Sequence, residues 1–182
     1  MLSFAGRILS SVVSMTMLLF SSYEGNNARF SDVFIGHDNQ IVRIRTSLLY
    51  AFDNDFEQIF RSGSPININY YLIVSRDGIL LDSIEYRNTV IYDPMERFFR
   101  IEAEVSNNFT FTVSCDDLRT IISEVDIFYD HWGIGGTYKF ELSASMERVT
   151  LESLEREFDL MMLWNYKTPK IVFEYKVELY ES

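Results

Sequence analysis

The chain contains only two histidines, and these are the first residues to test for chemistry. His131 directly follows Asp130, and a carboxylate beside an imidazole could form an acid/base pair. Adjacent strand residues point to opposite faces, so these two side chains need not touch, and no Gly-x-Ser-x-Gly sequence accompanies them. We therefore interpret Asp126–Trp132 as an aromatic strand edge that packs on the core. A hydrolase would require this pair to share a cleft with a nucleophile, and His37 is expected in an exposed turn.

A nucleophilic or metal-dependent mechanism has little support in the remaining side chains. The single cysteine, Cys115, precedes Asp116 and Asp117, and neighbouring negative charge opposes thiolate formation. We interpret Cys115 as a small buried residue in a strand. The sequence has no His-x-x-x-His, Cys-x-x-Cys or carboxylate-rich metal loop. We therefore expect no catalytic residue, no metal site and no cofactor, and a protein that is not an enzyme.

One glycine cluster, Gly133–Gly136, could suggest a phosphate-binding loop. In such a loop the glycines follow a strand and open a helix, so that backbone N–H groups face the phosphate. Here the next residues, Thr137–Ala144, alternate between polar and apolar side chains, which is typical of a strand. The glycine cluster is therefore predicted to be a turn.

A period of two dominates the chain from Arg29 onward and sets the expected fold. Apolar residues alternate with polar ones along five segments, and in each the apolar residues should face a core: 42–48, 99–105, 109–115, 138–144 and 171–179. Such alternation is typical of antiparallel sheets. Arg76-Asp77-Gly78 should form a hairpin turn between Asn67–Val74 and Ile79–Ile91, and Gly36–Asn39 should form another turn.

Two short helices interrupt the predicted strands. Asp53–Ser62 has a plausible N-cap and ends at Gly63, and the second helix opens at Ser114, with Asp117 in capping-box spacing, and reaches Val125. Leu151–Met161 fits either a helix or a strand. The prediction is one mainly β domain over residues 29–182, an antiparallel β-sandwich or strongly bent sheet of about eight strands.

Composition and charge narrow the functional classes. The chain has 182 residues, is 15% aromatic, and carries a formal net charge of −11. A surface of this charge repels nucleic-acid phosphates, so we expect no nucleic-acid binding. The nearest candidates for a basic stripe, Arg43 and Arg45, lie on one predicted strand. Aromatic residues favour a pleated, half-buried surface, in agreement with the predicted sheet.

The first 28 residues are predicted to be a signal peptide or an N-terminal membrane anchor. Arg7 precedes an apolar run, Ile8–Phe20, that is as long as a signal-peptide core and short for a membrane span. A signal peptidase that cuts after Ser22 would find Phe20 at position −3, where a small residue is preferred. The alternative is an uncleaved segment that contacts the membrane through residues 8–23. A buried N-terminal helix of the domain is the third possibility. We expect a periplasmic or cell-envelope location.

Several segments together resemble a bacterial family that is known only as a domain of unknown function. The segments that carry this resemblance are Phe60–Ile68, Val90–Asp93, Arg97–Ile101, Phe109–Phe111, Asp117–Val125 and Phe158–Tyr166. The resemblance covers most of the chain after residue 28 and rests on one Gly-x-Pro sequence and scattered aromatic residues. It implies an exported or envelope-associated protein, and it implies no catalytic residue.

The expected function is a non-enzymatic envelope module that binds or scaffolds another protein. The aromatic residues considered for binding are Tyr71, Phe99, Phe128, Tyr129, Trp132 and Trp164. Outward-facing aromatic residues could form a patch for a partner or a lipid. The alternative is a carrier of a lipid or other apolar ligand, in which the sheet closes around a cavity lined by residues such as Tyr71, Phe99, Phe111 and Phe140.

Overall fold

The computed structural model describes residues 25–38, 40–53, 56–104, 108–131, 134–151 and 156–178. Within these residues the protein is mainly β, and every strand pairing is antiparallel, as the alternation predicted. The prediction of a leader in residues 1–28, including the membrane contact of residues 8–23, falls almost entirely outside this part of the chain. No helix in the described part is both long and apolar enough to cross a membrane.

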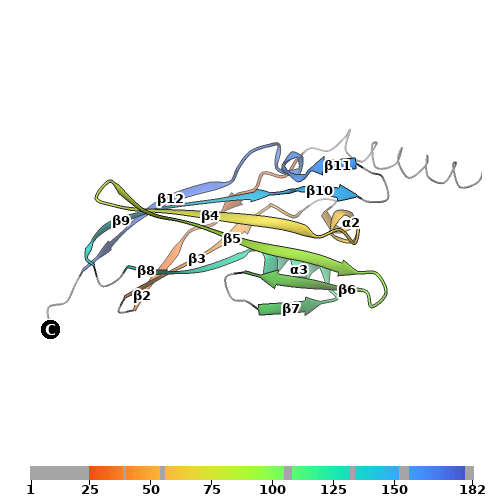
Figure 1. Cartoon of the computed structure of the whole chain (residues 1–182), viewed down its shortest axis with the longest axis horizontal. Helices are drawn as coiled ribbons and strands as arrows, with labels where there is room; N and C mark the ends of the chain where they lie inside the picture. Colours follow the sequence, from red (N-terminus) through yellow and green to blue (C-terminus); the bar gives the residue numbers. More distant parts are fainter. Residues whose placement is uncertain are drawn as a thin grey trace, which may run out of the picture.

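The larger sheet has six strands in the order β12-β9-β4-β5-β6-β7 (Figure 1). Its strands are β4 (Ile66–Arg76), β5 (Ile79–Asp93), β6 (Phe98–Ala103), β7 (Asn108–Thr112), β9 (Gly136–Met146) and β12 (Lys170–Val177). β12 and β7 are the two edges. The remaining strands each have two neighbours.

The long β4–β5 hairpin confirms the Asp-Gly prediction. Arg76 pairs with Ile79, so the turn consists of Asp77 and Gly78 alone. Their φ angles are 49° and 83°, as a two-residue turn of this kind requires at both central positions. The pairing shifts between Val74 and Ser75, where β5 contains an extra residue. This β-bulge bends the hairpin close to its tip.

The smaller sheet is built around β3 (Ile41–Leu49), which pairs with three other strands. These strands are β1 (Arg29–Phe30), β2 (Phe34–Asp38) and β8 (Glu124–Asp130). The predicted turn at Gly36–Asn39 is wrong over Gly36, His37 and Asp38, because all three belong to β2 and pair with β3. The polar residues here misled the prediction because an exposed strand of a small sheet needs few apolar side chains.

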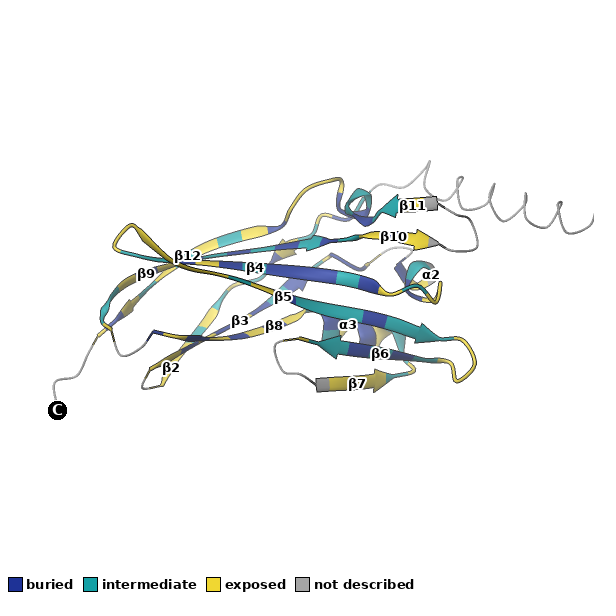
Figure 2. Ribbon diagram, in the orientation of Figure 1, coloured by how far each residue is buried: buried dark blue, intermediate teal, exposed yellow. Residues whose placement is uncertain are grey.

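The core lies between the inner faces of the two sheets. Tyr129 of β8 contacts Tyr138 and Phe140 of β9, with ring centroids 6.2 and 5.8 Å apart. The core-facing residues of β4, from Ile66 to Val74, are fully buried, whereas the residues between them range from buried to exposed (Figure 2). Each fully buried Phe or Leu contributes about 1.5–3 kcal/mol through burial, so these inner faces hold the sheets together.

Within the described residues, two short α-helices, one 3-10 helix and a separate two-stranded sheet complete the fold. α2 (Phe56–Phe60) is shorter than the predicted 53–62, because Arg61 and Ser62 already form a turn before Gly63, whose φ is 83°. α3 (Cys115–Ser123) begins at Ser114, whose hydroxyl accepts the Asp117 N–H as predicted. The ambiguous 151–161 region contains the end of β10 (Arg148–Leu151), then β11 (Arg156–Asp159) and the start of the 3-10 helix η2 (Leu160–Trp164).

The side chains of β7 point to the opposite faces of the sheet from those predicted. The alternation suggested that Phe109 and Phe111 face the core, yet they are 60% and 59% exposed. In the register with β6, Thr112 lies opposite Phe99 and therefore shares its inner face. α3 follows β7 almost directly and must reach the inner side of the sheet, where Leu118 and Ile122 are buried. That connection and the β6 register turn both phenylalanines outward.

Candidate functional site

The two histidines, 94 residues apart in the chain, meet at one end of the smaller sheet. His37 on β2 and His131 after β8 flank β3, and their Nε2 atoms are 2.9 Å apart. The His131 side chain is buried, with His131 1% exposed. The backbone N–H of His131 donates to the backbone carbonyl of Gln40. Tyr138 and Tyr175 of the larger sheet contact this pair, with ring centroids 6.0 Å from His131 and His37 respectively.

Two observations on the described residues bear on whether the histidine pair could form an acid/base or metal centre. Asp130 is exposed while His131 is buried, in agreement with the prediction that adjacent strand residues face opposite ways. In the described part of the chain, no group of three His, Cys, Asp or Glu side chains could hold a metal ion. His37 is exposed as predicted, but it lies in a strand. The imidazole–imidazole hydrogen bond joins β2 to the end of β8 across β3.

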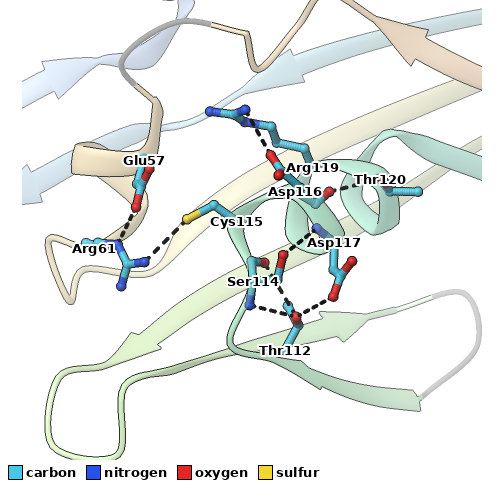
Figure 3. Close-up of polar contacts among 9 residues, drawn as sticks. All are labelled: Glu57, Arg61, Thr112, Ser114, Cys115, Asp116, Asp117, Arg119 and Thr120. Atoms are coloured by element: carbon cyan, nitrogen blue, oxygen red, sulfur yellow. Dashed lines mark hydrogen bonds and ion pairs between the residues drawn. The ribbon is translucent and has the colours of Figure 1, made fainter.

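Cys115 lies in a polar cluster between α2 and the start of α3 (Figure 3). The guanidinium of Arg61 donates to the Cys115 Sγ at 3.5 Å, to Glu57 at 2.9 Å and to the Tyr92 hydroxyl at 3.0 Å. Arg61 also lies 5.1 Å from the ring centroids of Tyr92 and Phe99. The prediction that Cys115 lies in a strand is wrong, because Cys115 is the first residue of α3.

The environment of Cys115 does not activate its thiol. Burial and the neighbouring Glu57 raise the pKa of the thiol, and the opposing effect of Arg61 is smaller. A raised pKa leaves less thiolate at neutral pH, and thiolate is the nucleophilic form. The sequence suggested the same outcome from Asp116 and Asp117, but Asp116 pairs with Arg119 and Asp117 extends toward Thr112. The acid that matters is Glu57, from the other helix.

The glycine cluster behaves as a turn over its described residues. Gly136 has a φ of 140° and begins β9, so a strand follows the cluster as predicted. A Cβ at Gly136 would lie 2.9 Å from the Arg76 side chain. The close approach of Arg76 and the positive φ both favour glycine at this position. Gly133 and Trp132, one of the aromatic residues considered for binding, lie outside the described residues.

The other aromatic residues considered for binding lie in separate places. Phe99, Tyr129 and Trp164 belong to the core, at 0%, 6% and 1% exposure. The Trp164 indole donates to the Ala51 carbonyl at 2.9 Å. Tyr71 is half-buried on the outer face of the larger sheet, and Phe128 is exposed on the outer face of the smaller one, beneath Arg43. These side chains do not form one binding surface.

The four side chains considered for an internal cavity are also divided. Phe99 and Phe140 are fully buried between the sheets, whereas Tyr71 and Phe111 lie on the outer face of the larger sheet. The described residues line hollows that are open to solvent. One, of about 680 Å³, has Phe34, Arg43, Arg45 and Asp126 in its wall, and Arg43 forms an ion pair with Asp126.

Exposed aliphatic side chains gather at the end of the β4–β5 hairpin. We call Ile73 and Ile79–Leu81 the hairpin tip. Ile79 is 68% exposed, Leu80 64%, Leu81 41% and Ile73 38%. Three consecutive apolar residues in a strand cannot all face one core, because neighbours point to opposite sides. This run directly after Asp77-Gly78 is the sequence signal for the surface, and alternation alone does not reveal it.

Exposed aromatic side chains gather at the β7 edge of the larger sheet. We call Phe98, Phe109, Phe111 and Val113 the β7 edge patch. Phe98 and Phe111 are in edge-to-face contact, with ring centroids 5.4 Å apart. They border the second hollow, of about 300 Å³, which also contains Ile91 and Arg100 in its wall. Val113 is 72% exposed just beyond the strand.

The described surface therefore offers two apolar areas and no catalytic constellation that we could identify. Both areas are formed by elements of the larger sheet, and the hairpin tip and the β7 edge patch share no residue. Comparison of the chain with protein-family models and with curated proteins finds no match.

Proposed function

We propose that this protein is a non-enzymatic β-sandwich module of the cell envelope that binds another protein through its hairpin tip. The observation that carries the proposal is the exposure of three consecutive aliphatic residues, Ile79–Leu81. Exposed apolar side chains that gather in one place mark interaction sites on soluble domains, and here they occupy both faces of the hairpin end, because neighbouring strand residues point to opposite sides. A rigid hairpin can present such side chains without losing much conformational freedom on binding.

The position of the tip favours a protein partner. The described chain begins at Gly25, whose carbonyl accepts a hydrogen bond from Asn165, directly after η2. In Figure 1 the hairpin tip projects at one end of the longest axis, and β11, which leads into η2, lies toward the other end. A membrane contact through residues 8–23, which the sequence suggests, would join the domain near η2. The tip would then point away from the membrane, toward other envelope proteins.

Charge narrows the partner further. The chain carries a net charge of −11, and Asp77 and Asp82 flank Ile79–Leu81. An apolar groove bordered by basic side chains is therefore the complementary surface. The envelope location and the resemblance to an envelope-associated family agree with this proposal and rest on the sequence alone.

Photocrosslinking in living cells tests the proposal on the full chain. A photoreactive p-benzoylphenylalanine replaces Leu80 in one strain and Phe34 in a second. Phe34 is the matched control, because it is 72% exposed on β2, in the other sheet. We expect one adduct of defined mass from position 80 and none of that mass from position 34. An added Ile79→Ser substitution should remove the adduct.

Three results would contradict the proposal. One is no protein adduct at position 80 under conditions that label a known complex. The second is the same set of adducts from both positions. The third is an adduct at position 80 that contains only lipid or a second copy of this chain.

A further inference from the structure

β7 differs from the opposite edge of its sheet in charge. From Asn108 to Ser114 the sequence is Asn-Phe-Thr-Phe-Thr-Val-Ser, with no charged residue. Within the described residues β7 pairs with β6 alone, so no described strand occupies its second side. The opposite edge, β12, carries Lys170, Glu174 and Lys176, all exposed. Charged residues, lysine above all, are what natural proteins place on edges that must not pair.

We infer that β7 is a pairing edge and that its partner is β7 of a second copy, joined antiparallel about a two-fold axis at Thr110. This inference does not depend on the proposed function. In this register Phe109 of each copy lies beside Phe111 of the other on the outer face, and Asn108 lies beside Thr112. Aromatic residues would meet aromatic residues and polar residues would meet polar ones. Cross-strand aromatic pairs of this kind stabilise antiparallel strands.

Charge also favours a second copy at this edge over other faces of the molecule. Two copies that each carry a net charge of −11 repel one another. An uncharged strand is where two such surfaces can approach with the least repulsion. On β6, Arg100 and Glu102 neutralise each other at 2.8 Å, and Asp117 contacts Thr112 at the end of β7. Salt screens the remaining long-range repulsion, so added salt should strengthen this dimer.

The contact is small, which sets the expected affinity. A phenylalanine side chain can bury about 150–250 Å², and about 60% of that area is exposed at Phe109 and at Phe111. With the strand backbone and Val113, the total stays below about 1,200 Å², the range of transient complexes. We expect a dissociation constant of about 10 μM or weaker.

Sedimentation velocity on the full chain in a mild detergent tests the inference, across concentrations from about 1 to about 300 μM. Thr110→Lys places two lysines opposite each other at the axis and should weaken the dimer at least tenfold. Thr110→Glu should do the same. Mixing the two variants should restore a dimer, because lysine and glutamate then face each other. Val172→Lys on β12 is the control and should leave association unchanged.

Circular dichroism and thermal melting of each variant separate lost pairing from lost folding. A wild-type chain that stays monomeric over the whole range would overturn the inference. So would the failure of the mixed Lys and Glu variants to form a heterodimer, or equal weakening by Val172→Lys. The hairpin-tip substitution Ile79→Ser should not change the dimer, so failure here leaves the proposed function open to its own test.

Discussion

Replacing Glu147 by glutamine should cost about 1 kcal/mol of stability at neutral pH, through a polar network on the outer face of the larger sheet. The Glu147 carboxylate accepts hydrogen bonds from the side-chain amides of Asn67 and Asn69, at 2.7 and 2.9 Å. Arg87 lies 3.0 Å from the same carboxylate. Every group that faces Glu147 in this network is therefore a donor.

The two asparagines cannot turn their amides around to accommodate a glutamine. The Asn67 Oδ1 accepts the Thr89 hydroxyl at 2.9 Å, and the Asn69 Oδ1 accepts Arg87 Nε at 3.0 Å. A glutamine would place its own N–H₂ group against one of these fixed donors. A hydrogen bond to a charged group contributes about 1.5–3 kcal/mol. Because the Glu147 side chain is 37% exposed, solvent screening reduces the expected loss to about 1 kcal/mol.

The effect should depend on pH in a defined direction. Hydrogen bonds from Asn69 and Asn67, followed by the charge of Arg87, lower the pKa of Glu147. A lowered folded-state pKa gives stability that is present above the unfolded value of about 4.3 and is lost as pH falls through the folded value. The stability difference between wild type and variant should therefore be largest at neutral pH and shrink as the pH falls below the unfolded value and through the lowered folded-state pKa of Glu147.

Urea unfolding of Glu147→Gln and of a matched control, at neutral and acid pH, tests both the size of the stability loss and its dependence on pH. Glu157→Gln is the control, because the Glu157 side chain is 57% exposed. Among the described residues, the ion-pair partner of Glu157 is Arg148, at 3.4 Å. We expect the control to change stability by less than about 0.5 kcal/mol. Equal losses from both variants, or a Glu147→Gln loss that persists unchanged at acid pH, would refute the reasoning.

Three further predictions concern the hairpin, the core and the thiol. Gly78→Ala should lower stability by about 1 kcal/mol in urea unfolding, because alanine is strained at the observed φ of 83°. Trp164→Phe should cost about 2 kcal/mol by the same measurement, because it leaves a cavity and removes the donor to the Ala51 carbonyl. Cys115 should react with iodoacetamide at neutral pH more slowly in the folded protein than in urea. Glu57→Gln should speed the reaction of the folded protein, because Glu57 helps to raise the pKa of the thiol; an unchanged rate would contradict this.

The sequence predicted those parts of the fold that depend on local chemistry. Asp77-Gly78 determines its own turn. The alternation in 138–144 identifies β9, because the apolar residues of that strand are buried and the residues between them are not. The facing of β7 could not be predicted in the same way. Alternation shows that Phe111 and Thr112 lie on different faces, but the register with β6 and the start of α3 decide which face is inner.

The candidate sites were harder to predict because each depends on residues that are distant in the chain. His37 and His131 meet only because β2 and β8 both pair with β3. The partners of Cys115 come from α2 and from the turn directly after it, more than fifty residues earlier. The hairpin tip did leave a local signal in Ile79–Leu81. Three of the six aromatic residues considered for binding, Phe99, Tyr129 and Trp164, fill the core, so aromatic content alone did not indicate a binding surface.

The β7 pairing that we infer and the membrane contact that the sequence predicts constrain each other. A two-fold axis perpendicular to the larger sheet reverses the direction of every strand, so the two hairpin tips of a dimer point in opposite directions. The same operation places the Gly25 residues of the two copies at opposite ends of the dimer. In each copy the Gly25 carbonyl accepts a hydrogen bond from Asn165, directly after η2, and η2 lies away from the hairpin tip. Two uncleaved anchors could enter one membrane only with the long axes of both copies lying along its surface. A dimer that stands away from the membrane therefore requires removal of the N-terminal segment. N-terminal sequencing of crosslinked dimer from fractionated cells decides between these arrangements, and an intact N-terminus on a dimer recovered from the soluble fraction would contradict this argument.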